Sequence, residues 1–384
     1  MASVAPRAAG TLSQDELVRY SRHIILPEVG LAGQEQLKKA RILVVGAGGL
    51  GSPVALYLAA AGVGHLGIVD FDTVDASNLQ RQILHSTSTV GQSKLDSAEA
   101  RLLNLNPYTK LERYDTRLSA ENALAIIEGY DVVVDGTDNF GTRYLVNDAC
   151  VLTGVPNAYG SIFRFEGQAS VFATKDGPCY RCLFRVPPPA GAVPNCAEGG
   201  VLGVLPGLVG TIQATEAIKL VLGIGRPLIG ELLLVDALDM QFRRLKVRKD
   251  PNCPACGTRE IKELVDLDVA CEAPPAKSGV RDISAADLDA RRKRGDSFFL
   301  LDVREPHEWA IARIEGAELI PLGEVGRSLE QIPRDREVVV YCKGGVRSLQ
   351  AAEQLVDAGF TQVTNLSGGI LAWRSDVDPS LSRY

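Results

Sequence analysis

Strand-like apolar runs alternate with helical patterns along the first part of the chain, from Arg41 to about Leu234. We interpret three of these runs as buried parallel strands: Arg41 to Val45, Leu66 to Asp70 and Asp131 to Asp135. Strands that alternate with helices in this way form a sheet that is covered on both faces. The pattern therefore predicts an α/β fold with a doubly wound, Rossmann-like and mostly parallel sheet.

The most apolar stretch runs from Val201 to Gly225, but Pro206, Glu216 and Lys219 interrupt it. Such a stretch cannot satisfy a bilayer along a whole span, so we interpret it as a buried helix. Residues 1–11 are rich in alanine and lack the continuous apolar segment of a secretory signal. We therefore expect a soluble, cytoplasmic protein with no membrane contact.

A second, smaller α/β pattern follows. It has strand-like runs at Phe298 to Asp302 and Glu337 to Tyr341, an amphipathic helix at Val346 to Ala358, and a further strand near Val363. Before it, the composition shifts to alanine, proline, lysine and serine, as in linkers. A chain of 384 residues is too long for one compact core. We predict a first domain at 12–262, a linker at 263–279 and a second domain at 280–384.

The charge distribution bears on the binding partners of the chain, and the cysteine content bears on metal binding and catalysis. The formal net charge is −6, acidic and basic residues are interspersed, and no block of lysine and arginine is present. We therefore expect no direct contact with nucleic acid. Eight cysteines stay as thiols in a reducing compartment. Cysteine pairs at metal-ligand spacing then indicate zinc, and isolated cysteines indicate catalysis or core packing.

A glycine-rich turn follows the first predicted strand and opens a helix, with glycines at Gly46, Gly48, Gly49 and Gly51. Backbone N–H groups in such a turn can hold phosphates where any Cβ would clash. Asp70 ends the next strand about 20 residues further on, where a carboxylate would bind a ribose hydroxyl. Up to this point NAD and ATP fit the pattern equally well.

The residues that follow separate the two nucleotides. Two cations, Arg81 and Lys94, and a further carboxylate, Asp138, suit a triphosphate with Mg²⁺ because they neutralise charge on the α-phosphate and pyrophosphate. A hydride-transfer site would need none of them. The candidate ATP-binding positions also include Asp72, Ser77, Asn78, Leu79, Gln80 and Asn139.

These segments, together with Arg19-Tyr20-Ser21-Arg22-His23, resemble the MoeB/ThiF family, relatives of ubiquitin-activating enzymes, over roughly Leu17 to Gly257. The resemblance implies that Asp138 holds Mg²⁺. It implies that Arg22 reaches into the site of a partner subunit, so a homodimer is expected. It also implies an ATP site formed by Gly49, Asp70, Asn78, Arg81, Lys94, Asp138 and Asn139.

Two cysteine pairs have the spacing of zinc knuckles: Cys179 with Cys182, and Cys253 with Cys256. Four thiolates can surround Zn²⁺ tetrahedrally and close its coordination, which makes the metal structural. Each pair alone is compatible with a redox role, whereas both together favour zinc. In the MoeB/ThiF family the same two pairs clamp the end of the domain.

The other cysteines of the first domain differ in their surroundings. Cys150 falls in a helical pattern with apolar neighbours, and we interpret it as core packing. Cys196 lies in a proline-rich loop from Val186 to Gly200, which by itself is compatible with an exposed thiol. Its surroundings resemble the crossing-loop cysteine of the family, which implies a catalytic thiol. Whether that thiol forms a thioester or resolves a disulfide stays open.

The second domain carries a cysteine between a predicted strand and a helix, in the segment Cys342-Lys343-Gly344-Gly345-Val346-Arg347. The glycines allow successive N–H groups to surround the sulfur, and Lys343 and Arg347 add positive charge, so a thiolate or persulfide is favoured. Four residues separate Cys342 from Arg347, one fewer than in protein phosphatases of related shape. The smaller loop suits a single sulfur atom better than a phosphate.

With Asp302-Val303-Arg304 and Asn365-Leu366-Ser367-Gly368-Gly369, this loop resembles a single rhodanese domain from about Ile283 to Trp373. We expect Asp302 and Arg304 to order the fold and to take no part in the chemistry. The chain is thus predicted to be an adenylyltransferase fused to a rhodanese sulfurtransferase.

The predicted function joins the two sites. ATP activates the C-terminal glycine of a ubiquitin-like sulfur carrier ending in Gly-Gly, and a Cys342 persulfide then gives the carrier thiocarboxylate, for molybdopterin, thiamine, cysteine or tRNA thiolation. A cysteine desulfurase or thiosulfate would supply the sulfur. The predicted catalytic residues are Cys342, Cys196, Arg81, Lys94, Asp138, Arg22 and Arg347, with ATP, Mg²⁺ and structural Zn²⁺ as cofactors.

Three alternatives fit parts of the pattern. One is a nicotinamide-dependent oxidoreductase with a redox-sensing rhodanese module. Another is a scaffold without turnover, which the intact Cys342 in its anion nest argues against. The third is an activator that conjugates a ubiquitin-like protein to lysines, with the rhodanese domain in a regulatory role.

Overall fold

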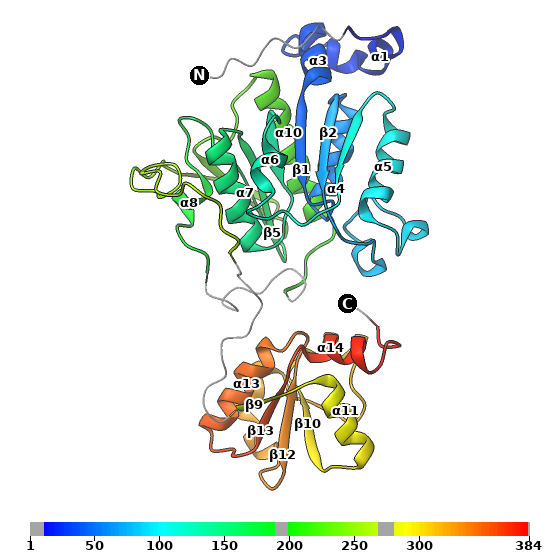
Figure 1. The fold of residues 1–384 in the computed structure, drawn as a ribbon, viewed down its shortest axis with the longest axis vertical. Helices are drawn as coiled ribbons and strands as arrows, with labels where there is room; N and C mark the ends of the chain where they lie inside the picture. The colour runs from blue at the N-terminus through cyan, green and yellow to red at the C-terminus, as the bar shows by residue number, and fades with distance from the viewer. Residues whose placement is uncertain (1–10, 189–198, 268–279, 383–384) are drawn as a thin grey trace. The chain divides into compact units, whose positions relative to one another are not determined.

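The computed structural model describes residues 11–188, 199–267 and 280–382. The described residues form two compact units, the first up to residue 187 and from 199 to 267, and the second from residue 280 onward (Figure 1). Each unit has its own sheet. We describe them one after the other.

The first unit contains an eight-stranded sheet in the order β3-β2-β1-β4-β5-β6-β7-β8. Neighbouring strands from β3 to β5 are parallel, and those from β5 to β8 are antiparallel. The predicted parallel sheet is thus continued by an antiparallel half. The strands are β1 Arg41–Val45, β2 His65–Val69, β3 Lys110–Tyr114, β4 Val132–Asp135, β5 Asn157–Phe163, β6 Glu166–Phe172, β7 Glu231–Asp236 and β8 Gln241–Lys246.

Helices cover both faces of this sheet, as the apolar runs predict. Side chains alternate along β1: Ile42 and Val44 pack with α4 and α10, whereas Leu43 and Val45 pack with α6 and α7 (Figure 1). The doubly wound architecture is therefore confirmed. The helices are α1 Gln14–Arg19, α2 Ser21–Ile24, α3 Gly30–Lys39, α4 Gly51–Ala60, α5 Lys94–Leu105, α6 Ala123–Ile127, α7 Phe140–Thr153, α8 Tyr180–Leu183 and α10 Leu205–Leu222, with short 3₁₀ turns η1 Ala76–Asn78 and η2 Thr87–Thr89.

The apolar stretch near the end of this unit forms α10, and the three residues that interrupt it are accommodated. Pro206 lies in the first turn, where its missing N–H costs no helical hydrogen bond. Glu216 is buried, but it accepts the Leu228 N–H at 2.8 Å and pairs with Lys219 Nζ at 2.6 Å. Among the described helices, none combines the length and apolarity needed to cross a membrane.

The strand order reverses beside β1, and in doubly wound sheets such a reversal marks the ligand crevice at the carboxyl ends of the strands, here β1 and β4. After β1 the chain passes through α4 to β2, and after β4 it passes through α7 to β5 on the other side. Because α4 and α7 cover opposite faces, the loops that follow β1 and β4 diverge. Ligands of doubly wound sheets bind at such a point.

The second unit has a five-stranded sheet in the order β11-β10-β12-β13-β9, with parallel neighbours throughout. Val338 and Val340 of β12 pack on one face with α13, and Val339 and Tyr341 pack on the other with α11 and α14. The elements are β9 Val280–Ile283, α11 Ala285–Arg294, β10 Phe298–Asp302, α12 Pro306–Ile311, β11 Glu318–Leu319, η3 Leu322–Arg327, η4 Leu329–Gln331, β12 Glu337–Tyr341, α13 Val346–Asp357, β13 Val363–Leu366 and α14 Gly369–Asp376.

Two glycines one turn apart in α10 provide a matched test of the packing against α4. A Cβ at Gly210 would lie 2.7 Å from Leu50 O and 2.6 Å from Pro53 Cγ, whereas a Cβ at Gly207 would meet nothing within 4 Å. We expect Gly210→Ala to lower the free energy of unfolding by about 1–3 kcal/mol. We expect Gly207→Ala to raise it by about 0.5–1 kcal/mol. Chemical denaturation followed by circular dichroism measures both, and equal stability of the two variants would contradict the close approach.

Candidate functional site

The glycine turn between β1 and α4 is closed so tightly that two of its positions exclude a side chain. Gly46 has φ +92°, and a Cβ at Gly51 would lie 1.8 Å from Gly46 O. Because α4 begins at Gly51, the first N–H groups of the helix lack partners within it and face the turn. The backbone of this turn has the form that the predicted phosphate cradle requires, and Gly48 and Gly49 lie within it.

Asp70, directly after β2, binds the backbone of this turn and lies close to Lys94. Its carboxylate accepts the N–H of Ala47 at 2.7 Å and that of Asp72 at 2.9 Å. Lys94 Nζ, at the start of α5, lies 2.8 Å from Asp72 Oδ2 and 3.8 Å from Asp70 Oδ1. The ammonium group is nearly buried, so the two carboxylates compensate a charge that would otherwise be costly.

The segment that contains Ser77, Leu79 and Gln80 runs past the same turn. Arg81 Nη2 donates to Asn78 Oδ1 at 2.6 Å, and a Cβ at Gly49 would lie 3.5 Å from Arg81 Cγ. Arg81 therefore lies beside the cradle, with its guanidinium oriented by a neighbouring amide.

Asp138 and Asn139 follow β4 on the other side of the crevice, and both are exposed. The loops touch behind them, because a Cβ at Gly46 would lie 3.3 Å from Gly136 O. Asn139 Oδ1 accepts the Thr142 N–H at 2.8 Å and so caps α7. The Asp138 carboxylate is exposed at the predicted Mg²⁺ position, at the same edge of the sheet as Lys94.

The buried carboxylate of Asp135, the last residue of β4, binds the loop that carries Asp138. Asp135 Oδ1 accepts the Thr137 hydroxyl at 2.6 Å and the Thr137 N–H at 3.0 Å, while Arg143 Nη2 donates to Thr137 O at 3.2 Å. Burial raises the pKa of Asp135, and the nearby Arg143 opposes that rise. The Thr137 backbone thus donates its N–H to the buried Asp135 and accepts a hydrogen bond from the buried Arg143.

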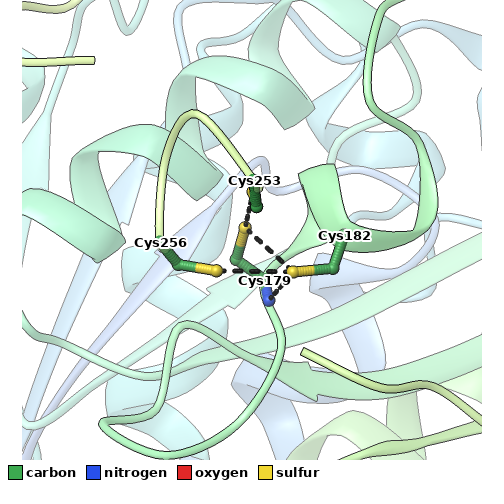
Figure 2. A group of neighbouring side chains, drawn as sticks. All are labelled: Cys179, Cys182, Cys253 and Cys256. Atoms are coloured by element: carbon green, nitrogen blue, oxygen red, sulfur yellow. Dashed lines mark hydrogen bonds between the residues drawn. The ribbon is translucent and has the colours of Figure 1, made fainter. Parts of the chain in front are cut away.

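The four knuckle cysteines converge on one point (Figure 2). Cys179 Sγ lies 3.5 Å from Cys253 Sγ and 4.0 Å from Cys182 Sγ, and Cys182 Sγ lies 3.3 Å from Cys256 Sγ. All four sulfurs lie within 4.8 Å of one another. Thiolates around a tetrahedral Zn²⁺ are roughly 3.8 Å apart, given a Zn–S bond of about 2.3 Å. The donor set therefore fits a closed structural site.

Backbone and side-chain contacts hold this cluster against α7. Hydrogen bonds with the Cys179 and Cys256 thiols, together with the Asp250 N–H, lower the pKa of Cys182. Tyr180 N–H donates to Asn147 Oδ1 at 2.7 Å, and Arg181 forms a bidentate pair with Asp148. The first cysteine pair is thus fastened to the helix whose N-terminus carries Asn139.

Cys342 of the second unit follows β12 and is only 1% exposed. Its Sγ accepts the Gly345 N–H at 3.1 Å and lies 3.4 Å from Ser348 Oγ. Gly345 has φ +99°, and a Cβ at Gly369 would lie 2.4 Å from Cys342 O. Of the predicted nest, the Gly345 N–H contacts the sulfur, and the Gly368-Gly369 segment packs against the same loop.

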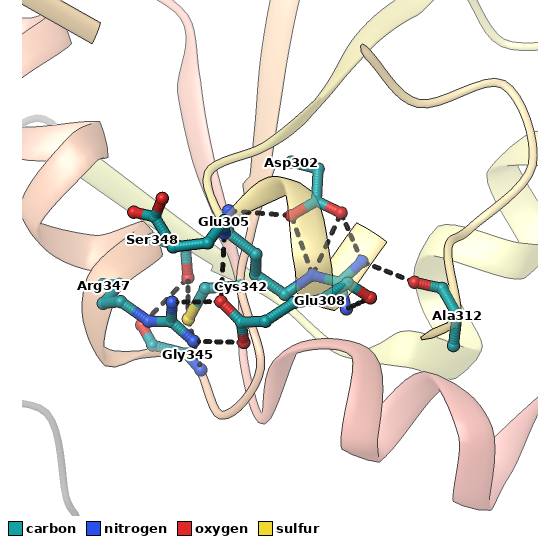
Figure 3. A network of polar contacts seen from close by, with 9 residues as sticks. Asp302, Glu305, Glu308, Ala312, Cys342, Gly345, Arg347 and Ser348 are labelled. Carbon is teal, nitrogen blue, oxygen red and sulfur yellow. Dashed lines mark hydrogen bonds and ion pairs between the residues drawn. The ribbon is translucent and has the colours of Figure 1, made fainter. Parts of the chain in front are cut away.

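An ion pair between Arg347 and Glu308 lies next to Cys342 and Gly345 (Figure 3). Arg347 donates to both oxygens of Glu308, at 2.6 and 2.8 Å. Burial would raise the pKa of Glu308, but the hydrogen bonds from Arg347 and from the Glu305 N–H outweigh it and lower the pKa. Arg304 and Asp302 form a fully buried pair at 2.5 Å, and Arg304 also donates to Ala312 O. The buried pair thus orders α12, which presents Glu308 to Arg347.

Two models of known protein families match the chain. The ThiF family covers residues 20–255, more than half of the chain, and the Rhodanese-like domain covers residues 284–376. The chain belongs to the ThiF family. The resemblance inferred from the motifs is therefore confirmed for both parts.

Two relatives of this ThiF-family protein are named as both adenylyltransferase and sulfurtransferase, and a third, which matches the first part of the chain, is named as an adenylyltransferase alone. The "Probable adenylyltransferase/sulfurtransferase MoeZ" of Mycobacterium tuberculosis is 49% identical, and the match covers 98% of this chain and 97% of that protein. The "Adenylyltransferase and sulfurtransferase MOCS3-1" of Zea mays is 42% identical, covering 98% and 85%. The "Sulfur carrier protein adenylyltransferase" of Thermus thermophilus is 56% identical, covering 67% and 98%. This ThiF-family chain is accordingly an adenylyltransferase and sulfurtransferase.

Solved structures support the fold of the first unit. A crystal structure of E. coli MccB with MccA-N7isoASN aligns with a TM-score of 0.57 over 62% of this chain and 75% of that one, at 22% identity. At this identity the likeness extends to the architecture alone.

Two of the predicted catalytic residues, Arg22 and Cys196, are not placed beside the glycine turn or Cys342 in the described structure. Arg22 is exposed on α2; the preceding Tyr20 packs against Gly62, beyond the C-terminus of α4. That is the end of α4 opposite the glycine turn, so Arg22 lies away from the crevice of its own chain. Cys196 falls outside the described residues.

Sequence reasoning missed three residues that hold these sites. His85 Nε2 lies 3.0 Å from Ala47 O and Nδ1 lies 2.9 Å from Ser97 Oγ. Burial lowers the pKa of His85, so its neutral ring can donate to the glycine turn. Glu308 and Ser348 play comparable parts at Cys342. Their partners are distant in the sequence or lie across a turn, so no local spacing indicates them.

Zinc binding is tested by removing one thiol. We expect Cys253→Ser to lose the bound Zn²⁺ and to lower the melting temperature, because three thiolates no longer close the coordination. Cys150→Ala is the control, since Cys150 packs in the core and its loss leaves the cluster intact. Elemental analysis and thermal unfolding measure the two effects. Equal zinc content in Cys253→Ser and the wild type would exclude the four-cysteine site.

The buried ion pair of the second unit is tested by Asp302→Asn. The substitution leaves the Arg304 guanidinium buried without a counter-charge, so the free energy of unfolding should fall by about 3–5 kcal/mol. Asp335→Asn is the control, because its pair with Arg336 is exposed and should contribute little. Both tryptophans of the chain, Trp309 and Trp373, lie in this unit, so their fluorescence during chemical denaturation reports its unfolding. A fall below 1 kcal/mol would contradict the predicted cost.

Proposed function

We propose that this enzyme uses ATP to adenylylate the C-terminal glycine of a ubiquitin-like sulfur carrier ending in Gly-Gly, and then converts that glycine to a thiocarboxylate with sulfur held on Cys342. The observation that supports the proposal is that one chain combines a tight glycine turn, beside which Lys94 and Arg81 lie, with a buried Cys342 sulfur that accepts the Gly345 N–H. Relatives over nearly the whole chain are named for both activities.

The adenylylation half depends on charge. The carrier carboxylate attacks the α-phosphate, a P–O bond to the β-phosphate breaks, and pyrophosphate leaves. Lys94 and Arg81 would stabilise the charge that develops on the transferred phosphate and on the pyrophosphate. Asp138 would hold Mg²⁺, which neutralises phosphate charge when bound. Asp70 would orient the ribose.

The sulfur half begins when the Cys342 thiolate accepts the outer sulfur of a donor. With thiosulfate, the Sγ–S bond forms, the donor S–S bond breaks, and sulfite leaves with the electron pair. The outer sulfur of the persulfide then attacks the carbonyl carbon of the acyl-adenylate. A C–S bond forms, the C–O bond to phosphate breaks, and AMP leaves an acyl disulfide on Cys342.

Release of the thiocarboxylate requires two electrons, and we assign this step to a second thiol, Cys196. Its thiolate attacks Cys342 Sγ, so the Sγ–S bond to the acyl group breaks and the thiocarboxylate leaves. The new disulfide between Cys196 and Cys342 is then reduced by an external thiol. A cysteine desulfurase persulfide is an equivalent sulfur donor to thiosulfate in this scheme.

We also propose a homodimer in which Arg22 completes the partner's ATP site. The position of Arg22 supports a role in trans, since it lies at the end of α4 opposite the glycine turn where the nucleotide is expected. The relatives' names favour a place in molybdenum cofactor biosynthesis, and the same carrier chemistry serves thiamine, cysteine and tRNA thiolation. Conjugation of the carrier to lysines is the disfavoured alternative.

Two variants separate the halves of the reaction. Asp138→Ala should reduce ATP–pyrophosphate exchange, measured with a ubiquitin-like carrier ending in Gly-Gly, by about 100-fold or more. It should leave the transfer of thiosulfate sulfur to Cys342 unchanged. Cys342→Ala should do the reverse, with normal exchange and no thiocarboxylate by mass spectrometry. Cys150→Ala controls for the loss of a thiol as such. Wild-type amounts of thiocarboxylate from Cys342→Ala would rule out the sulfur half.

A further inference from the structure

Ser348, in the first turn of α13, lies behind the reactive sulfur and is fully buried. Three acceptors surround its hydroxyl: Asn365 Oδ1 at 2.7 Å, Gly345 O at 3.0 Å and Cys342 Sγ at 3.4 Å. In Figure 3 the contacts of Ser348 and Gly345 converge on the Cys342 sulfur. A hydroxyl has one proton to donate. It therefore satisfies only one of these acceptors at a time.

The orientation of the Asn365 amide fixes which atom faces the hydroxyl. Asn365 Nδ2 donates to Asp282 Oδ1 at 2.8 Å, and the two residues are partners in the parallel pair β13–β9. Because the nitrogen is turned toward a carboxylate, the oxygen must face Ser348. Asp282 and Asn365 thus form a fixed support at the end of a polar chain that leads to Cys342.

The charge on the sulfur decides where the hydroxyl proton goes. When Cys342 is a neutral thiol, its S–H can donate to Ser348 Oγ while the hydroxyl donates to Asn365. When Cys342 is a thiolate, it has no proton and becomes the stronger acceptor, because hydrogen bonds to an ionised group are stronger than those to a neutral amide. Rotation about a single torsion then directs the same proton to the sulfur.

We propose that Ser348 is a positioning residue whose hydroxyl moves its proton from Asn365 to Cys342 Sγ when the sulfur becomes anionic. This inference rests on the proposed sulfur transfer through Cys342 and adds Ser348 to the residues that act in that transfer. The thiolate is the form that attacks a sulfur donor, and it is the form released when a disulfide on Cys342 is reduced. In the persulfide the charge lies on the outer sulfur and not on Sγ, so Ser348 acts on the free thiolate.

The charged groups near the sulfur are Lys343 and Arg347 of the loop, Glu308 of α12 and Asp282 of β9. Arg347 is paired with Glu308 and Asp282 with Asn365, and Lys343 is nearly buried. A neutral substitution at Ser348 alters none of these charges. A change in the ionisation of Cys342 in that variant therefore measures the effect of the lost hydroxyl group.

The test uses the full-length, zinc-loaded protein. The rate of iodoacetamide alkylation of Cys342, followed by mass spectrometry of its peptide, is measured against pH for the wild type and Ser348→Ala. The midpoint of the profile should move to higher pH by about one unit, so alkylation below the midpoint slows about 10-fold. Ser348→Thr keeps the hydroxyl and should restore the wild-type midpoint. Ser367→Ala, at an exposed position beside the nest, is the control.

Asn365→Ala provides an independent variant, because it removes the competing acceptor and keeps the hydroxyl. Its midpoint should stay at the wild-type value or move to lower pH, and a move to higher pH would overturn the proposal. A Ser348→Ala profile that loses amplitude without any shift would also overturn it, since that result indicates a merely structural role. Loading of wild-type Cys342 with thiosulfate sulfur is measured in parallel. If the wild type accepts no sulfur, the proposed function fails whatever the profiles show.

Discussion

Both chemical sites depend on a tight turn between a buried parallel strand and a helix, in which a glycine permits a backbone arrangement that a side chain would disturb. After β1, a Cβ at Gly51 would lie 1.8 Å from Gly46 O; after β12, Gly345 has φ +99°, and a Cβ there would lie 3.1 Å from Gly368 N. Such a turn can bring backbone N–H groups and a helix N-terminus close to an anion. The strands, helices and layers around the two turns position these N–H groups.

Helix α7 links the parts of the first unit. Its N-terminus carries Asn139 at the crevice, its middle lies in the core through Cys150, and Asn147 and Asp148 bind the first zinc knuckle. The four-cysteine cluster is therefore joined to the same helix that carries Asn139 beside Asp138. We expect loss of order in the cluster to weaken the contacts that hold α8 against α7.

The sequence predicted the repeating part of this architecture well, because parallel strands covered on both faces are apolar runs with defined ends. Arg41–Val45 and Phe298–Asp302 have the predicted limits, and β4 begins one residue late. The residues that hold the sites were not predictable in the same way. His85 contacts Ala47 from 38 positions away, and Glu308 pairs with Arg347 from 39 positions away. Spacing rules describe neighbours along one element, so such partners emerge only from the fold.

The charge around each turn separates phosphate chemistry from sulfur chemistry. Beside the glycine turn, Lys94 and Arg81 are held by oxygen atoms of Asp72 and Asn78, and Lys94 is nearly buried. We expect these two cations to compensate the charge of a triphosphate. Beside Cys342, Arg347 is paired in bidentate fashion with Glu308, and the sulfur itself is nearly inaccessible. A loop whose arginine is already neutralised is poorly suited to a phosphate dianion, yet it still offers N–H groups to one negative sulfur. Glu308 therefore supports the prediction that loop length first indicated, in which the second turn stabilises a single sulfur anion.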